Sequence, residues 1–159
     1  MKIGVISDTH LEGPTPPLER VVENYFKDTD IILHAGDIHA MAVLDAFKGK
    51  RVHAVAGNRD RREVRERLPG KTVITVNGLR IGLTHGWGPP FWLEKRIAPL
   101  FEGIHCLVFG HSHWAVNHRN NGILYFNPGT FIGGIFSLWR PSIGLLTIDK
   151  DIQGEIIWL

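Results

Sequence analysis

Seven side chains of types that bind metal ions follow short apolar segments along the sequence. They are Asp8, His10, Asp37, Asn58, His85, His111 and His113. The apolar segments that precede them are Ile3–Ser7, Ile31–Ala35, Val52–Ala56, Leu79–Thr84 and Ile104–Phe109. In α/β sheets, ligands bind beyond the carboxyl ends of the strands. We therefore expect the seven side chains to converge at one sheet edge, where neighbouring glycines permit tight turns.

This ligand set suits two metal ions that share a bridging carboxylate, because seven ligands exceed an ordinary four-coordinate site. Two divalent ions about 3.5–4 Å apart clamp the attacking and leaving oxygens of a phosphate. They also lower the pKa of bound water towards roughly 7. Carboxylate, amide and imidazole ligands favour Mn²⁺, Fe²⁺ or Zn²⁺. The pattern predicts hydrolysis of a phosphate ester by in-line attack of a metal-bridging hydroxide.

The elements that position these side chains alternate between strands and helices. Apolar runs predict strands over Lys2–Ser7, Asp30–Ala35, Arg51–Ala56, Lys71–Val76, Leu79–Thr84, Ile104–Phe109, Ala115–Arg119, Ile123–Phe126, Ile143–Ile148 and Glu155–Leu159. Helices are expected over Pro17–Lys27, Ala40–Phe47, Arg61–Leu68 and Phe91–Leu100. Asn77-Gly78 and Asn120-Asn-Gly122 each predict a hairpin. The order indicates an α/β fold with either a mixed sheet or two packed sheets.

Length and composition narrow the class of protein. The 159 residues predict one domain over 1–159, and 43% apolar with 21% charged residues is ordinary for a globular chain. The single cysteine, Cys106, indicates a reducing, cytoplasmic location and is interpreted as a core residue. A net charge of +2 gives no reason to expect a nucleic acid partner. The uncharged stretch between Arg119 and Arg140 holds three sets of turn residues, which argues against a membrane helix.

Six short motifs carry a resemblance to a known family. They are Asp8-x-His10, Gly36-Asp37, Gly57-Asn58-x-Asp60, His85-Gly86, Gly110-His-x-His113 and Asn127-Pro-Gly129. In this order they resemble the calcineurin-like metallophosphoesterases, and the short chain is most similar to the small single-domain YfcE-like phosphodiesterase branch. The resemblance extends from residue 1 to about residue 148. It implies two packed mixed sheets flanked by helices, a four-layer α/β/β/α sandwich.

The resemblance also implies roles for individual residues. Asp8, His10, Asp37 and His113 would hold one ion, and Asp37, Asn58, His85 and His111 would hold the second. Asp37 would be the bridge, while Asn58 and His85 would belong to the catalytic group. Two divalent ions are implied, with manganese first and iron, zinc or nickel as alternatives. The implied substrate is a small-molecule phosphate ester.

Two positions depart from the family pattern. Many relatives have histidine after Gly-Asn, where this chain has Arg59, and many read His-Gly-His where it has His85-Gly-Trp87. Arg59 does not donate a proton at neutral pH, but its guanidinium binds phosphate as a planar fork. We therefore include Arg59 as a candidate catalytic residue. Proton delivery to the leaving group would need a water molecule or a leaving group that does not require it.

Other interpretations stay open from the sequence alone. The chain is either an enzyme or a catalytically weak protein-binding scaffold resembling the retromer subunit of the superfamily, and a nuclease is less favoured. Trp87, Trp92 and Trp114 either form pocket walls that stack on a base or aryl group or pack in the core. Phe131–Trp139 is either core or a homo-oligomer contact, Arg140 is a candidate phosphate contact and His39 a candidate support for a ligand.

Overall fold

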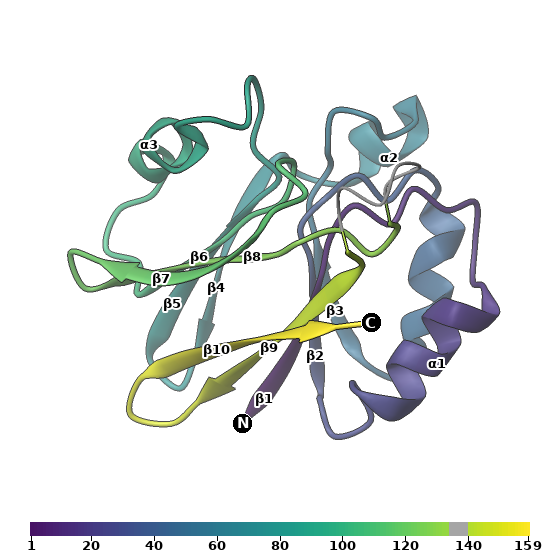
Figure 1. Cartoon of the computed structure of the whole chain (residues 1–159), viewed down its shortest axis with the longest axis horizontal. Coiled ribbons are helices and arrows are strands. Elements are labelled where there is room, and N and C mark those ends of the chain that lie inside the picture. Colours follow the sequence, from purple (N-terminus) through teal and green to yellow (C-terminus); the bar gives the residue numbers. More distant parts are fainter. Residues whose placement is uncertain (134–139) are drawn as a thin grey trace.

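Two five-stranded sheets form the body of the protein, as the computed structural model shows for residues 1–133 and 140–159 (Figure 1). The first sheet has the order β10-β9-β1-β2-β3, with bounds Ile152–Trp158, Ser142–Ile148, Lys2–Ile6, Ile31–His34 and Arg51–Ala54. The second has the order β4-β5-β6-β8-β7, with bounds Lys71–Val76, Leu79–Thr84, Cys106–Val108, Ile123–Pro128 and Ala115–Asn120. Both sheets mix parallel and antiparallel pairs, so the predicted fold class is confirmed.

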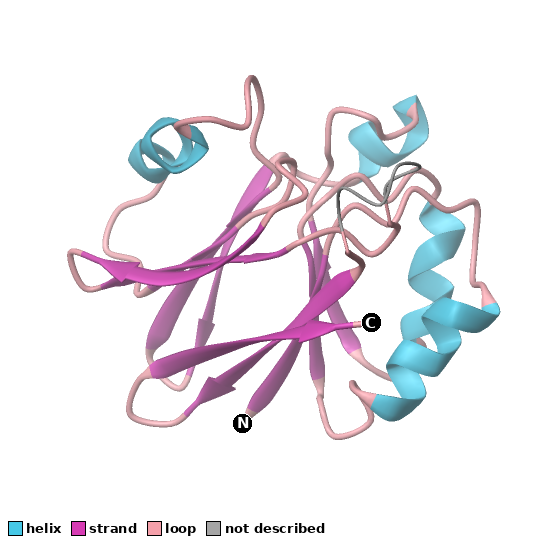
Figure 2. Cartoon of the chain, viewed as in Figure 1, coloured by secondary structure: helices cyan, strands magenta, loops and turns pink. Residues whose placement is uncertain are grey.

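Helices cover the outer faces of the two sheets (Figure 2). On the first sheet lie α1 (Pro16–Asn24) and the 3₁₀ helix η1 (Met41–Phe47), while α2 (Arg62–Arg67) follows β3. On the second sheet lie α3 (Leu93–Ile97) and the 3₁₀ helix η2 (Ala98–Leu100). Each layer has its own cluster of buried apolar side chains, with Phe26 and Phe47 under the first pair of helices and Ile97 and Phe109 under the second.

The main core lies between the two sheets. It joins alternate residues of β1, such as Ile3 and Val5, to side chains of the second sheet, such as Leu83 and Val108. Alternation places these residues on one face of each strand and leaves the other face for the helices. The four layers are therefore held by three apolar interfaces, which fix the relative position of the strand ends.

Both predicted hairpins are present. Asn77 and Gly78 between β4 and β5 have φ angles of 50° and 78°, and Asn121 and Gly122 between β7 and β8 have 49° and 79°. A two-residue hairpin turn with positive φ at both positions matches the right-handed twist of its strands. Asparagine and glycine adopt this conformation with little steric cost, which is why so short a signal identified the turns.

Element boundaries differ modestly from the expectations. The segment predicted as a helix near residues 40–47 forms 3₁₀ turns from Met41 to Phe47 and has no side-chain cap at its start. The helix expected over Phe91–Leu100 is divided into α3 and η2, because Pro99 stands in the first turn of the second piece. Part of Phe131–Trp139 lies outside the described residues, although Phe131 itself is buried in the core under α1. Among the described residues, no helix is long and apolar enough to span a membrane.

Candidate metal centre

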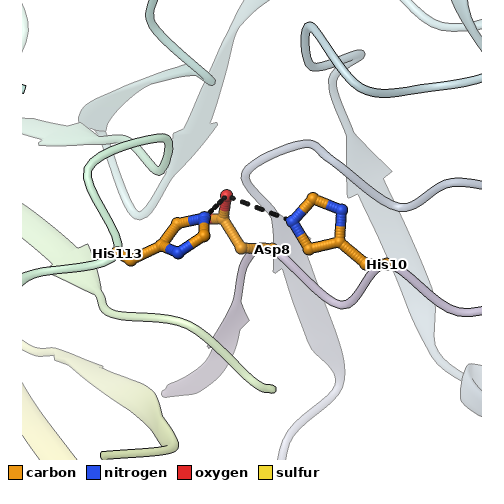
Figure 3. Close-up of side chains that lie close together, drawn as sticks. All are labelled: Asp8, His10 and His113. Atoms are coloured by element: carbon orange, nitrogen blue, oxygen red, sulfur yellow. Dashed lines mark ion pairs between the residues drawn. The ribbon is translucent and has the colours of Figure 1, made fainter. Parts of the chain in front are cut away.

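The first part of the site brings together Asp8, His10 and His113 (Figure 3). Asp8 and His10 follow β1, and His113 lies in the turn after β6. Asp8 Oδ1 lies 3.1 Å from His113 Nε2 and 4.0 Å from His10 Nε2. The candidate ligand atoms of the three residues lie within 4.8 Å of one another, which is compact enough for one cation to contact all three.

The second part is formed by Asp8, Asp37 and His85, all of them buried. Asp37 Oδ2 lies 3.4 Å from His85 Nε2 and 3.8 Å from His10 Nε2, so this carboxylate contacts imidazoles of both parts. Such a position between the two groups suits the bridging role predicted for Asp37. Asp8 belongs to both candidate groups, whereas Asp37 belongs to the second.

Asn58 connects His85 to His111. Asn58 Oδ1 lies 3.2 Å from His85 Nε2 and 2.9 Å from His111 Nδ1. The opposite ring nitrogens face carbonyls, His85 Nδ1 at 2.8 Å from Ala35 O and His111 Nε2 at 2.6 Å from Gly88 O. A ring nitrogen facing a carbonyl must donate, which leaves His85 Nε2 and His111 Nδ1 as electron-pair donors in the neutral rings. Three electron-pair donors then face one another, an arrangement that a cation satisfies.

Left-handed backbone conformations orient five of the predicted ligands. The φ angles are 53° for Asp8, 47° for His10, 51° for Asp37, 69° for His111 and 60° for His113. Nine non-glycine residues among those described have positive φ, so more than half belong to this set. Such residues cost of order 1–3 kcal/mol each and cluster at functional sites. These five residues lie in the turns that follow β1, β2 and β6.

Glycines beside the ligands permit close packing of the turns. A Cβ atom at Gly110 would lie 2.1 Å from Ser7 Oγ and 2.9 Å from Asp8 Oδ2. A Cβ atom at Gly57 would lie 2.1 Å from Asp37 Oδ1. Real Cβ contacts are never so short, so only glycine fits where these turns approach the carboxylates.

Several supporting residues had no role assigned from the sequence. The buried carboxylate of Asp60 accepts hydrogen bonds from the backbone N–H groups of His39 (2.6 Å) and Gly57 (2.7 Å), which fixes the turn that carries Asn58. Asn127 donates to the Gly110 carbonyl at 2.9 Å and so supports the turn that carries His111 and His113. Both residues belong to the quoted motifs, but only the fold shows which backbone groups they hold.

Burial and neighbouring charges shift the pKa values of the site. Burial lowers the pKa of His10, although Asp37 and Asp8 oppose the effect. Burial would raise the pKa of Asp37, but the hydrogen bond and charge of His85 outweigh it and the pKa is lowered. Burial likewise opposes the charged form of His85, yet its contacts with Asp37 and the charge of Asp8 raise the pKa. The lowered pKa keeps the Asp37 carboxylate ionised, as a metal ligand must be.

The structure also places the remaining candidates. The backbone N–H of Arg59 donates to Asp37 Oδ1 at 2.7 Å, and its charge helps to lower the pKa of His10. The His39 ring pairs with Glu12, since its Nε2 lies 3.1 Å from Glu12 Oε1. The Arg140 guanidinium lies over the Trp158 ring at 5.8 Å. Burial raises the pKa of the fully buried Cys106 thiol, which fits the predicted role as a core residue.

The donor set fits divalent cations. Asp8 Oδ1 is buried and accepts no hydrogen bond from the described residues, although its partner oxygen accepts two. A buried carboxylate oxygen that accepts no hydrogen bond is costly unless a cation lies beside it. Oxygen and imidazole nitrogen are ligands for manganese, iron and zinc.

Comparison with known proteins identifies the family. The model of the calcineurin-like phosphoesterase superfamily domain matches residues 1–151. The chain therefore belongs to this superfamily, and the resemblance noted in the sequence is confirmed. The family uses divalent metals, in agreement with the candidate metal-binding groups.

Individual relatives cover nearly the whole chain. A probable metallophosphoesterase of Methanocaldococcus jannaschii is 35% identical over 99% of this chain and 81% of its own length. A phosphodiesterase of the same organism is 28% identical over 99% of each.

Solved structures share the fold. One, described as a novel archaeal phosphodiesterase, has a TM-score of 0.78 at 24% identity and covers 100% of both chains. Vps29 of Entamoeba histolytica complexed with zinc has a TM-score of 0.73 at 23% identity and covers 99% of both chains. At these identities the likeness extends to the fold only.

Proposed function

We propose that this protein is a phosphodiesterase that depends on two divalent metal ions. The observation that carries the proposal is the pair of candidate metal-binding groups that share the buried Asp8, one with His10 and His113 and the other with Asp37 and His85. Asn58 adjoins the second group and joins His85 to His111. These seven predicted ligands follow five strands. Four of these side chains follow strands of the first sheet and three follow strands of the second. Strained backbone conformations cost free energy and cluster at functional sites, which favours a functional site over ordinary turns.

The ligands divide between two positions. One ion would be held by Asp8, His10, Asp37 and His113, and the second by Asp37, Asn58, His85 and His111. When bound, the ions supply Lewis acidity towards the phosphate oxygens and a water of lowered pKa as the nucleophile. The protein keeps the imidazoles oriented through the carbonyls of Ala35 and Gly88, which face the ring nitrogens opposite Asn58.

Arg59 would bind the substrate phosphate. The backbone N–H of Arg59 donates to Asp37 Oδ1, and the side chain is exposed. The guanidinium charge helps to lower the pKa of His10. A guanidinium forms paired hydrogen bonds to phosphate oxygens and stabilises the negative charge that gathers there. Since Arg59 supplies no proton, we infer that water protonates the leaving group or that good leaving groups are preferred.

A diester is proposed as the substrate class over a monoester. The relative of Methanocaldococcus jannaschii that covers 99% of each chain is named a phosphodiesterase. An arginine without a general acid also suits substrates with a good leaving group better than alkyl monoesters. Manganese is the proposed metal, with iron, zinc and nickel as alternatives for the same ligands.

The test compares hydrolysis of bis-p-nitrophenyl phosphate with that of p-nitrophenyl phosphate. Metal-stripped protein is assayed before and after addition of Mn²⁺, together with Asp37→Ala and Asp37→Asn. Loss of a ligand shared between two ions should reduce diester turnover by at least about 10²-fold, in line with the loss of several kcal/mol of transition-state stabilisation. The matched control is Asp45→Asn, an exposed carboxylate that pairs with Lys48 and should keep full activity when changed.

A different result would favour a protein-binding scaffold on the same fold. In that case the folded protein would bind two ions and hydrolyse neither ester. The complete ligand set favours the enzyme, because a scaffold has no need to preserve a bridging carboxylate. Retained diester turnover in both Asp37 variants, with unchanged melting temperatures, would rule out the proposed metal-dependent mechanism.

A further inference from the structure

A pocket of about 440 Å³ lies on the other side of the turn that carries His111 and His113. Its walls are mostly apolar, with Phe91, Trp92 and Trp114 among them, and Ser112, Glu94 and Lys95 supply polar groups. Because Ser112 stands between His111 and His113 in the chain, one turn borders both this pocket and the metal centre.

Three aromatic side chains at the pocket remain open to solvent. The exposed fractions are 63% for Phe91, 71% for Trp92 and 42% for Trp114, and the rings of Phe91 and Trp114 meet edge to face at 5.6 Å. Large aromatic side chains that remain exposed forgo the free energy of burial, and clusters of them mark ligand sites. Trp92 also has a φ of 60°, a strained conformation for a bulky residue that core packing does not explain.

The segment that carries two of these rings is fixed to the protein at both ends. From α3, the Arg96 guanidinium donates to the carbonyls of Trp87 (3.1 Å) and Phe91 (3.2 Å), and also to that of Pro89. The Gly88 carbonyl of the same segment lies 2.6 Å from His111 Nε2. The backbone that carries these rings is therefore tied to α3 and to His111, which favours a preorganised surface.

The polar groups that line the pocket are Ser112, Lys95 and Glu94, and the Glu94 carboxylate pairs with His118 Nε2 at 3.0 Å. The Ser112 hydroxyl oxygen accepts from Asn127 Nδ2 at 3.0 Å and from the Trp114 backbone at 3.3 Å. Within the part of the chain that the structure describes, it donates to no acceptor, so its proton is available to a ligand. Lys95 lies over the Trp92 ring at 4.6 Å and adds positive charge at the rim. A purely apolar partner would use neither group.

We infer that this pocket binds a heteroaromatic group, of the size of a nucleobase, that belongs to one of the two ester groups of the phosphodiester substrate. The inference rests on the proposed function and narrows its substrate class. The phosphate would lie at the metal centre, and the base would extend past the 111–113 turn to stack on the exposed Trp114. Stacking on aromatic side chains favours any base with a π face and does not require a particular one.

The test uses two diesters with the same leaving group, p-nitrophenyl thymidine 5′-phosphate and p-nitrophenyl ethyl phosphate. For the wild-type protein with Mn²⁺, kcat/KM should be about 10-fold or more higher for the thymidine ester, as expected for one stacked base. In Trp114→Ala the ratio between the two esters should fall about 10-fold. Trp158→Ala is the matched control, because Trp158 is 47% exposed but lies on β10, and it should leave the ratio unchanged.

The outcomes separate this inference from the proposed function. If both esters are hydrolysed equally well, the phosphodiesterase stands and the base pocket is wrong. If neither is hydrolysed, titration with AMP is measured by tryptophan fluorescence. Quenching in the wild type that is lost in Trp114→Ala would then support the pocket without the proposed activity. If Trp114→Ala changes neither the ratio of kcat/KM between the two esters nor the quenching by AMP, the inference is overturned. The aromatic side chains would then be a docking surface for another protein.

Discussion

The two oxygens of the Asp8 carboxylate have different surroundings, although the side chain is fully buried. Oδ2 accepts hydrogen bonds from the Ser7 hydroxyl and, at 3.2 Å, from the His111 N–H. Oδ1 accepts none from the described residues. Its contact is His113 Nε2 at 3.1 Å, and a buried acceptor that accepts no hydrogen bond costs about 1–3 kcal/mol. The metal-free protein therefore carries a local cost that a bound cation offsets.

Asp8→Asn should separate stability from function. The amide would place an N–H group near His113 Nε2 and keep an oxygen for the Ser7 and His111 donors. We expect the metal-free variant to melt at the same temperature as the wild type or a few degrees above it, corresponding to about 1 kcal/mol. Stabilisation by Mn²⁺ and diester turnover should both be lost. Calorimetry with and without Mn²⁺ measures this, and a metal-free variant clearly less stable than the wild type would contradict it.

The buried His34 should make the stability of the protein depend on pH. Burial lowers the pKa of His34 to about 3, against about 6.5 in an unfolded chain. The unfolded state therefore binds more protons below pH ~6.5. Stability is complete above that value and decreases as the pH falls towards about 3, by up to about 1.4 kcal/mol per pH unit.

His34→Gln removes this titration and keeps a donor for Thr9 Oγ1, which lies 3.1 Å from His34 Nε2. In metal-free protein between pH 6 and 4, unfolding of the wild type should take up nearly one proton more than unfolding of His34→Gln. The free energy of unfolding should therefore fall less steeply with decreasing pH in the variant. Urea unfolding at several pH values gives the slope. His53→Gln is the comparison, because burial and the charge of Arg51 also lower the pKa of this half-buried histidine, and it should change the slope less than His34→Gln. Identical slopes for wild type and His34→Gln would show that His34 titrates normally.

Among the elements, the turns after β1 and β6 determine the geometry of the site. Gly110→Ala would bring a Cβ atom into contact with Ser7 Oγ and Asp8 Oδ2. Overpacking of this kind costs about 1–3 kcal/mol and would displace the neighbouring ligands. We expect a lower melting temperature and diester turnover reduced at least 10-fold, because small displacements of ligands strongly affect metal-assisted reactions.

The control for Gly110→Ala is Gly70→Ala. A Cβ atom at Gly70 meets nothing within 4 Å, and its backbone does not require positive φ. The melting temperature and turnover should therefore stay at wild-type values or rise slightly. Equal effects of the two substitutions would mean that the turn after β6 tolerates a side chain, contrary to its packing against Ser7.

Local signals predicted most elements, since hairpin turns and apolar runs depend on neighbours in sequence. Asn77-Gly78 predicted both the hairpin and the two residues of its turn. The ends of the strands before Asp8 and His85 were predicted to within about a residue. The positive φ of Asp8 or His111 was not predictable, because it is imposed by contacts with distant segments. The roles of Asp60 and Asn127 were hidden for the same reason: their partners, such as His39 and Gly110, lie far along the chain.

For the whole molecule, bound metal ions would connect the two sheets. Asp8 and Asp37 follow strands of the first sheet, whereas His85 and His113 follow strands of the second. Ligand binding to the folded state alone stabilises it by about 2.7 kcal/mol per site at one hundred times Kd. We predict that Mn²⁺ raises the melting temperature of EDTA-treated protein by roughly 5–10 °C per site. Asp37→Asn should reduce this gain, and its persistence would argue that the ions bind elsewhere.

The most direct test is a titration of metal-stripped protein with Mn²⁺ while hydrolysis of bis-p-nitrophenyl phosphate is followed. Two ions acting together on one phosphate predict that turnover increases until two equivalents have bound and then stays constant. In His113→Ala the break should shift towards one equivalent, with most of the turnover lost. A break at one equivalent in the wild type, or full turnover without metal, would contradict the proposed two-metal phosphodiesterase.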